Sequence, residues 1–140
     1  MKRTTNYEVR TTNKSRLLNW GLVVVYAALI FFFSSRPTLP PGLGFEFFPW
    51  QDKVAHLAEY ALLCWLLIRA FHFSEKFSVV NAVSAAVILS VFYAMSDEIH
   101  QAFVPPRQCD YFDFLADSIG VAISAIYIIL KSIKTATPID

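Results

Sequence analysis

The chain has 140 residues, enough for one domain, and 56% of them are hydrophobic while only 16% are charged. With a mean hydropathy of +0.47, this composition is too apolar for an average soluble domain and favours a membrane protein. The net charge of +1 says nothing about partners, because the charged residues are segregated along the chain. We expect no nucleic-acid partner.

The N-terminal half begins with a basic, solvated stretch over residues 1–16, which we interpret as a disordered cytoplasmic tail. Residues 17–33 carry no charge and are too long for the apolar core of a signal peptide. No small-x-small cleavage pattern follows them, so we expect a retained first transmembrane helix. Residues 34–51 are rich in proline, glycine and aromatic side chains, which predicts an irregular loop along the membrane interface.

Three further apolar segments predict helices over about 51–73, 77–100 and 113–130, with a break at Ser74-Glu75-Lys76. Each segment can cross a hydrocarbon layer of about 30 Å at about 1.5 Å per residue. Alternating polar and apolar residues, as in a membrane barrel, are missing from these runs. The sequence therefore predicts an all-α integral membrane bundle of four transmembrane helices over residues 17–131, followed by a C-terminal tail over 132–140.

The distribution of basic residues predicts how the bundle is oriented. Nine of the twelve Lys and Arg residues lie in the two terminal segments and the 69–76 connection, and three (Arg36, Lys53 and Arg107) lie on the other side. Because basic residues accumulate on the cytoplasmic side, we expect both termini in the cytoplasm. The polar motifs below would then face outward.

The second predicted helix begins with a polar face. Asp52, His56 and Tyr60 are four residues apart and share one side of the helix, and Lys53 borders it. Glu59 lies deeper, where a carboxylate is rare unless it is paired, protonated or faces a cavity. This face predicts one wall of a polar pocket.

Helices three and four supply the other polar groups. Asp97, His100 and Gln101 share one helix face, and Asp113 and Asp117 share another that continues with Gly120. We expect Asp113 to cap helix four, Gly120 to allow a close helix approach, and Glu98 and Asp110 to be solvated. Cys109 is expected to be exposed and Cys64 to pack in the interior.

A mixed cluster of His56, His100, Asp97, Asp113 and Arg107 allows three kinds of chemistry: proton relay, metal ligation, or binding of a phosphate or polar head group. The chain has no HExxH motif and no His/Cys ligand spacing, so we predict no metal and no other cofactor. For Arg107, an anion clamp and a salt bridge that locks the 101–113 loop remain alternatives.

These polar motifs resemble the VanZ-like family over about residues 50–125. The similar elements are D-K-x-x-H at 52–56 with Tyr60, Tyr93 with D-E-x-H-Q-x-F-x-P-x-R at 97–107, and D-x-x-x-D-x-x-G at 113–120. Two positions depart from the family pattern, since Pro106 stands where glycine is frequent and Asp117 where asparagine is common. The resemblance implies a small multi-pass protein of the bacterial cytoplasmic (inner) membrane, in a family whose founding member is associated with low-level resistance to the glycopeptide teicoplanin.

From these motifs and the resemblance, we expect an outward-facing pocket that interacts with membrane lipids and binds a lipid-linked cell-wall precursor or a lipophilic glycopeptide. The alternative is an intramembrane enzyme acting on a lipid-linked phosphate or ester, with Asp97 or His100 as general base, Arg107 stabilising charge, and Asp113 as a further catalytic candidate. In a third interpretation the polar cluster only holds the helices together. The predicted ligand-binding residues are Asp52, Lys53, His56, Tyr60, Asp97, Glu98, His100, Gln101, Arg107, Asp113 and Asp117.

Overall fold

The computed structural model of the chain describes residues 6–36, 50–105 and 107–136. Its elements are α1 (Asn6–Ser34), α2 (Gln51–Arg69), a π-helical turn η1 (Ala70–Ser74), α3 (Val79–Gln101) and α4 (Tyr111–Ala136). None of the described residues is in a strand, and four helices are long and apolar enough to cross a membrane. The predicted all-α membrane bundle is confirmed.

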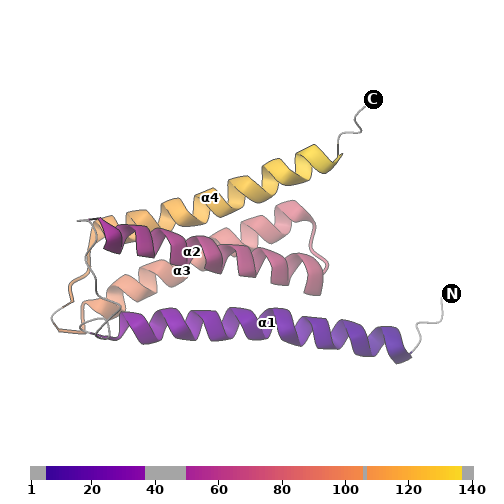
Figure 1. Cartoon of the computed structure of the whole chain (residues 1–140), viewed down its shortest axis with the longest axis horizontal. Helices are drawn as coiled ribbons and strands as arrows, with labels where there is room; N and C mark the ends of the chain where they lie inside the picture. The colour runs from indigo at the N-terminus through magenta and orange to yellow at the C-terminus, as the bar shows by residue number, and fades with distance from the viewer. Residues whose placement is uncertain (1–5, 37–49, 106, 137–140) are drawn as a thin grey trace.

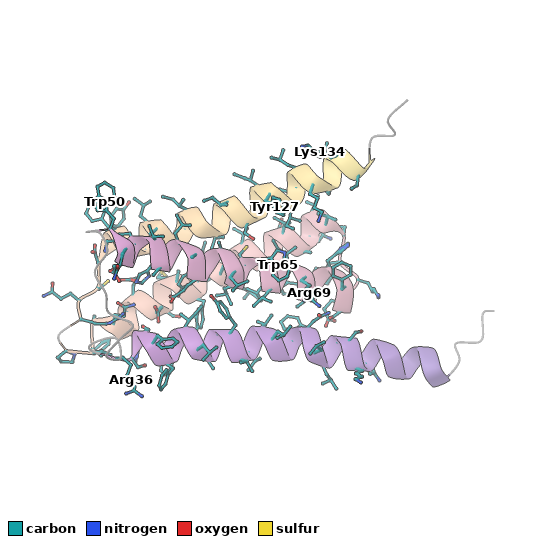
Figure 2. The ribbon with its side chains drawn as sticks, in the orientation of Figure 1. Arg36, Trp50, Trp65, Arg69, Tyr127 and Lys134 are labelled. Atoms are coloured by element: carbon teal, nitrogen blue, oxygen red, sulfur yellow. The ribbon has the colours of Figure 1, made fainter. Side chains whose placement is uncertain are left out.

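The four long helices lie roughly side by side, with α2, α3 and α4 packed together and α1 along one flank (Figure 1). The beginning of α1 and the end of α4 lie at the same end of the bundle (Figure 1). Arg69 and Lys134 lie towards this end, whereas Arg36 and Trp50 lie at the opposite end (Figure 2). The basic residues are therefore separated as the charge pattern predicts, while the compartment that each end faces stays a prediction.

The helix boundaries differ from the predicted ones mainly at the two ends of the chain. Helix α1 begins at Asn6 rather than near Leu17, because residues 6–16 contain no proline or glycine to stop the helix. Helix α4 likewise continues past Leu130 to Ala136. The expected disordered tail is therefore helical from Asn6 onward. Most of the predicted interfacial loop (residues 37–49) lies outside the described residues.

The turn between α2 and α3 falls where the sequence predicts it and is tied to α1. Lys76 has a positive φ of 60°, which reverses the chain after η1. Asn19 donates a hydrogen bond to Ser74 Oγ at 3.0 Å, and Trp20 Nε1 donates to Glu75 Oε1 at 2.9 Å. These contacts attach α1 to the end of the bundle opposite to the polar motifs.

Helices α2 and α4 approach closely at Gly120. A Cβ atom at this position would overlap the backbone oxygen of Leu57 and lie 3.1 Å from the backbone nitrogen of Ala61. The predicted close approach at Gly120 is therefore present. It brings the first turns of α4 directly against the first turns of α2.

The interior is formed by apolar side chains, with Tyr60, Leu63, Cys64 and Val121 almost fully buried. Many leucine, isoleucine, valine and phenylalanine side chains point outward instead. An apolar exterior is what a lipid environment requires of a helical bundle.

Candidate functional site

The polar residues of the three packed helices meet at the end of the bundle opposite to its termini. This end holds the start of α2, the end of α3 and the start of α4 (Figure 1). Because Gly120 lets α2 and α4 touch, Asp113 and Asp117 on α4 face Lys53 and His56 on α2.

Lys53 is the centre of one group of ion pairs. Its Nζ atom donates hydrogen bonds to Asp110 Oδ2 at 2.8 Å and to Asp113 Oδ1, and it lies 3.7 Å from Asp52 Oδ2. The bond from Lys53, together with one from the Phe112 amide, lowers the pKa of Asp110 below its ordinary value. The positive charge of Lys53 is therefore already neutralised by carboxylates.

The residue that caps α4 is Asp110, and the prediction that Asp113 does so is wrong. Asp110 Oδ1 accepts a hydrogen bond from the Phe112 amide at 2.8 Å, and its carbonyl oxygen accepts one from the Asp113 amide at 3.0 Å. The helix begins two residues earlier than expected, at Tyr111, so Asp113 lies inside its first turn. There its carboxylate is buried and faces Lys53 instead of the end of the helix.

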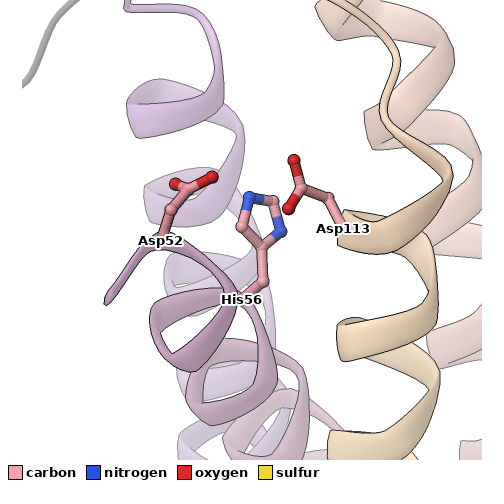
Figure 3. Close-up of side chains that lie close together, drawn as sticks. All are labelled: Asp52, His56 and Asp113. Carbon is pink, nitrogen blue, oxygen red and sulfur yellow. The ribbon is translucent and has the colours of Figure 1, made fainter. Parts of the chain in front are cut away.

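His56 lies at the base of the polar end, between carboxylates from two helices. Its ring lies between Asp52 and Asp113 (Figure 3), and its Nδ1 atom lies 3.0 Å from Asp117 Oδ1. His56 and Asp117 are both buried. This buried imidazole–carboxylate pair joins α2 to α4.

Helix α3 contributes two further buried carboxylates. Asp97 Oδ2 accepts a hydrogen bond from Gln101 Nε2 at 3.1 Å. Glu98 Oε2 accepts one from the Asp110 amide at 2.9 Å, and the residue is only 3% exposed. The expectation that Glu98 is solvated is therefore wrong, because the loop before α4 folds over it. Asp110 is only partly solvated, with 39% of its side chain exposed.

His100 does not join the other polar residues. Its Nε2 atom lies 3.0 Å from Ser35 Oγ, and its ring packs on Phe31 at 4.6 Å between centroids. Tyr60 lies deeper, fully buried, with its ring 6.3 Å from that of Tyr93. The structure thus directs His100 towards α1 and places Tyr60 in the interior.

Two cavities open at the polar end. The first has a volume of about 470 Å³ and is lined by polar groups of α2, α4 and the preceding loop. The second, of about 290 Å³, lies against α1 and has Ile30, Phe33 and Glu59 in its wall. Four residues line both cavities: Asp52, His56, Gln101 and Arg107.

At the two cavities, the Arg107 guanidinium has no ion pair among the described residues. Its backbone amide donates to Val104 at 2.7 Å, but no salt bridge or side-chain hydrogen bond links its guanidinium to another described residue. The predicted salt bridge from Arg107 to Asp97 or Asp113 is therefore not present. Lys53 holds the 101–113 loop in place instead, through Asp110.

Comparison with family models gives a match to VanZ/LLP1 over residues 4–132. The chain belongs to the VanZ/LLP1 family. The match covers α1 as well as the motifs of residues 50–125, so the whole four-helix bundle is the family unit. Comparisons with curated proteins and with solved structures give no match.

Two groups of side chains in this VanZ/LLP1 protein have a geometry suited to a metal ion. One is Asp52, His56 and Asp113, and the other is His56, Glu98 and Asp117; within each group the ligand atoms lie within 4.8 Å of one another. Local motif spacing does not reveal the second group, because its members come from three helices. The sequence signal that points to this group is the unusual number of acidic residues in apolar helices.

Proposed function

We propose that this protein lies in the bacterial cytoplasmic membrane and binds the anionic head group of a lipid-linked or lipophilic ligand in its outward-facing cavities. The observation that carries this proposal is Arg107, which lines both cavities and pairs with no other described side chain. A guanidinium binds phosphate or carboxylate through two parallel hydrogen bonds, so a free one at a cavity is suited to an anion.

The remaining polar groups favour a head group that also carries hydroxyl or amine groups. Asp52 and Gln101 line both cavities beside Arg107. Carboxylate and amide oxygens accept hydrogen bonds from hydroxyl and amine donors. Saccharide and peptide parts of a cell-wall precursor, or of a glycopeptide, supply such donors.

The second cavity supports a ligand with an apolar portion. Ile30 and Phe33 of α1 line it together with Ala55 of α2. A chain entering from the lipid would contact these side chains while its head group reached Arg107. This arrangement supports a role in cell-envelope biology, and we propose that it underlies altered susceptibility to teicoplanin-type glycopeptides.

Replacing Arg107 tests the proposal directly. The purified protein is reconstituted in nanodiscs and titrated with a polyprenyl monophosphate, with the uncharged polyprenol as comparison. Arg107→Ala is expected to weaken binding of the phosphate by about 10–100-fold, since hydrogen bonds to charged groups contribute about 1.5–3 kcal/mol. Binding of the polyprenol should not change.

Arg36→Ala is the matched control, because Arg36 lies at the same end of the bundle (Figure 2), packs over Phe32 at 4.4 Å and lines neither cavity. This variant should bind as the parent protein does. Equal binding of the phosphate by the parent and Arg107→Ala would contradict the proposal. In host cells, Arg107→Ala should lose the effect of the protein on teicoplanin susceptibility, whereas Arg36→Ala should keep it.

A second candidate function, catalysis on a lipid-linked phosphate or ester, is favoured by the buried His56–Asp117 pair beside Arg107. A carboxylate that orients an imidazole is the arrangement of a general base. Neither of the bases expected from the sequence has this arrangement, because Asp97 pairs with Gln101 and His100 faces α1. Release of phosphate or alcohol by the parent protein, lost in His56→Ala, would favour the enzyme over the binding protein.

A further inference from the structure

Behind the cavities, three buried side chains from three helices converge on one point. His56 of α2, Glu98 of α3 and Asp117 of α4 are 6%, 3% and 0% exposed. Asp117 Oδ2 and Glu98 Oε1 have no hydrogen-bond partner among the described residues. A buried carboxylate oxygen without a partner is costly, and native structures seldom keep one unless a ligand or a proton satisfies it.

The nearby cations do not neutralise these two carboxylates. Lys53 is bound to Asp110 and Asp113. No lysine or arginine among the described residues forms a salt bridge with Glu98 or Asp117. His56 lies at hydrogen-bond distance from Asp117, and within the described part of the chain Glu98 accepts a bond only from the uncharged Asp110 amide. Two carboxylates and one imidazole in a water-poor interior need a further positive charge to stay ionised together.

The geometry of this group fits a metal ion. One ligand atom from each residue can be chosen so that all three lie within 4.8 Å of one another. Metal–ligand distances of about 2.0–2.2 Å require only a small further approach of the side chains. Three protein ligands leave a coordination position open, and His56 also lines both cavities, which gives the ion a route of entry.

The other group of similar geometry is less suited to an ion. Asp52 is exposed, and the Lys53 ammonium already lies against the carboxylates of Asp52 and Asp113. An ion there would have to displace or repel the lysine charge. The group of His56, Glu98 and Asp117 has no such competitor among the described residues.

We propose that His56, Glu98 and Asp117 bind one divalent transition-metal ion. One imidazole nitrogen and two carboxylate oxygens suit Zn²⁺ or Mn²⁺, since imidazole favours the former and carboxylates accept both. The ion neutralises the two buried acids and ties α2, α3 and α4 together at the polar end. This inference goes beyond the proposed ligand binding, because it involves neither Arg107 nor a lipid.

The test uses the full-length protein in detergent, purified through a tag without histidine, stripped with a chelator and then loaded with Zn²⁺ or with Mn²⁺. Bound metal is measured by mass spectrometry, and the gain in melting temperature on loading is recorded. The parent protein should hold about one equivalent per chain and gain thermal stability. Glu98→Gln and Asp117→Asn, which keep the shape of each side chain, should each weaken metal binding on the order of 100-fold or more, since loss of even an outer-shell partner costs about 10–100-fold.

Asp52→Asn is the matched control, because Asp52 belongs only to the other group, and it should bind metal as the parent does. Arg107→Ala should also keep the metal, which separates this inference from the proposed function. A parent protein that holds no Zn²⁺ or Mn²⁺ at micromolar free metal would overturn the proposal. So would metal binding that survives Glu98→Gln and Asp117→Asn but is lost in Asp52→Asn.

Should either amide variant fail to fold, the spectrum of bound Mn²⁺ in the parent protein decides the matter. Electron paramagnetic resonance of Mn²⁺ bound at His56 should change when the imidazole is labelled with ¹⁵N, because one ligand is a nitrogen. A spectrum that is insensitive to the label means oxygen ligation only, which contradicts the site.

Discussion

At the scale of single residues, the roles of the acids are set by their nearest partners. Asp110 caps α4 and pairs with Lys53, whereas Asp113, three residues later, is buried against the same lysine. Both are aspartates near a helix start, and each can cap a helix. The sequence alone does not distinguish them, because the choice depends on which residue the loop leaves outside the first turn.

The lowered pKa of Asp110 predicts an acid-dependent loss of stability. A group whose pKa is lower in the folded state stabilises the fold above its unfolded pKa of about 3.9, and this contribution is lost as the pH falls through the folded value. The melting temperature in detergent should therefore decrease as the pH is lowered below about 4. The effect should be a few degrees at most, since partly exposed ion pairs contribute about 1 kcal/mol or less.

Asp110→Asn should have a lower melting temperature at neutral pH and a flatter acid profile. Its side-chain oxygen can still cap α4, so only the ion pair is removed. Asp52→Asn serves for comparison, since Asp52 is 64% exposed and 3.7 Å from Lys53. Identical acid profiles for the parent and Asp110→Asn would disprove the assignment.

At the scale of the helices, the α2–α4 contact positions the site. Gly120 touches the backbone of α2 at Leu57 and Ala61. This contact sets the depth in the bundle at which Asp117 meets His56. The Asp117–His56 pair lies about one helical turn closer to the polar end than Gly120 does. The helical spacing of Asp113, Asp117 and Gly120, four and then three residues, is visible in the sequence, whereas the identity of the facing helix is not.

Gly120→Ala is expected to separate α2 from α4. The added methyl would overlap the backbone oxygen of Leu57, which cannot move without shifting a helix. We expect destabilisation of about 1–3 kcal/mol, the usual cost of overpacking, together with weaker metal binding. Thermal unfolding in detergent and metal content measure the two effects.

Gly21→Ala provides the control within α1, because nothing lies within 4 Å of a Cβ atom placed there. That variant should be as stable as the parent or slightly more so, since alanine favours helix by about 1 kcal/mol over glycine. If both variants behave alike, the close approach at Gly120 does not position the site.

At the scale of the whole molecule, Arg69 and Lys134 lie towards the end that holds the start of α1 and the end of α4 (Figures 1 and 2). The two cavities lined by Asp52 and Arg107 lie at the opposite end. The larger number of basic residues at the end with the termini predicts that both termini are cytoplasmic and that the cavities face outward. With that orientation, the cavities would be open to the external ligands of the proposed function.

The two native cysteines allow the orientation to be measured. Cys109 is exposed at the polar end and Cys64 is buried. A membrane-impermeant maleimide added to intact protoplasts or spheroplasts should label the parent protein, and Cys109→Ser should lose that label. Labelling only after the membrane is opened would place the cavities in the cytoplasm.

Sequence alone determined the number and approximate span of the helices, the end at which polar residues gather, and the family motifs. Long uncharged runs and local helical spacing encode these features, and they depend little on which helices are neighbours. Tertiary structure alone decided that α4 lies against α2, that Glu98 and Asp117 are buried beside His56, that His100 turns towards α1, and that Arg107 stays unpaired among the described residues. The burial of Glu98 depends on the fold of the loop before α4, through the Asp110 amide. The contacts of His56 with Asp117 and of His100 with Ser35 join residues 61 and 65 positions apart, and helical periodicity carries no information about contacts at that separation.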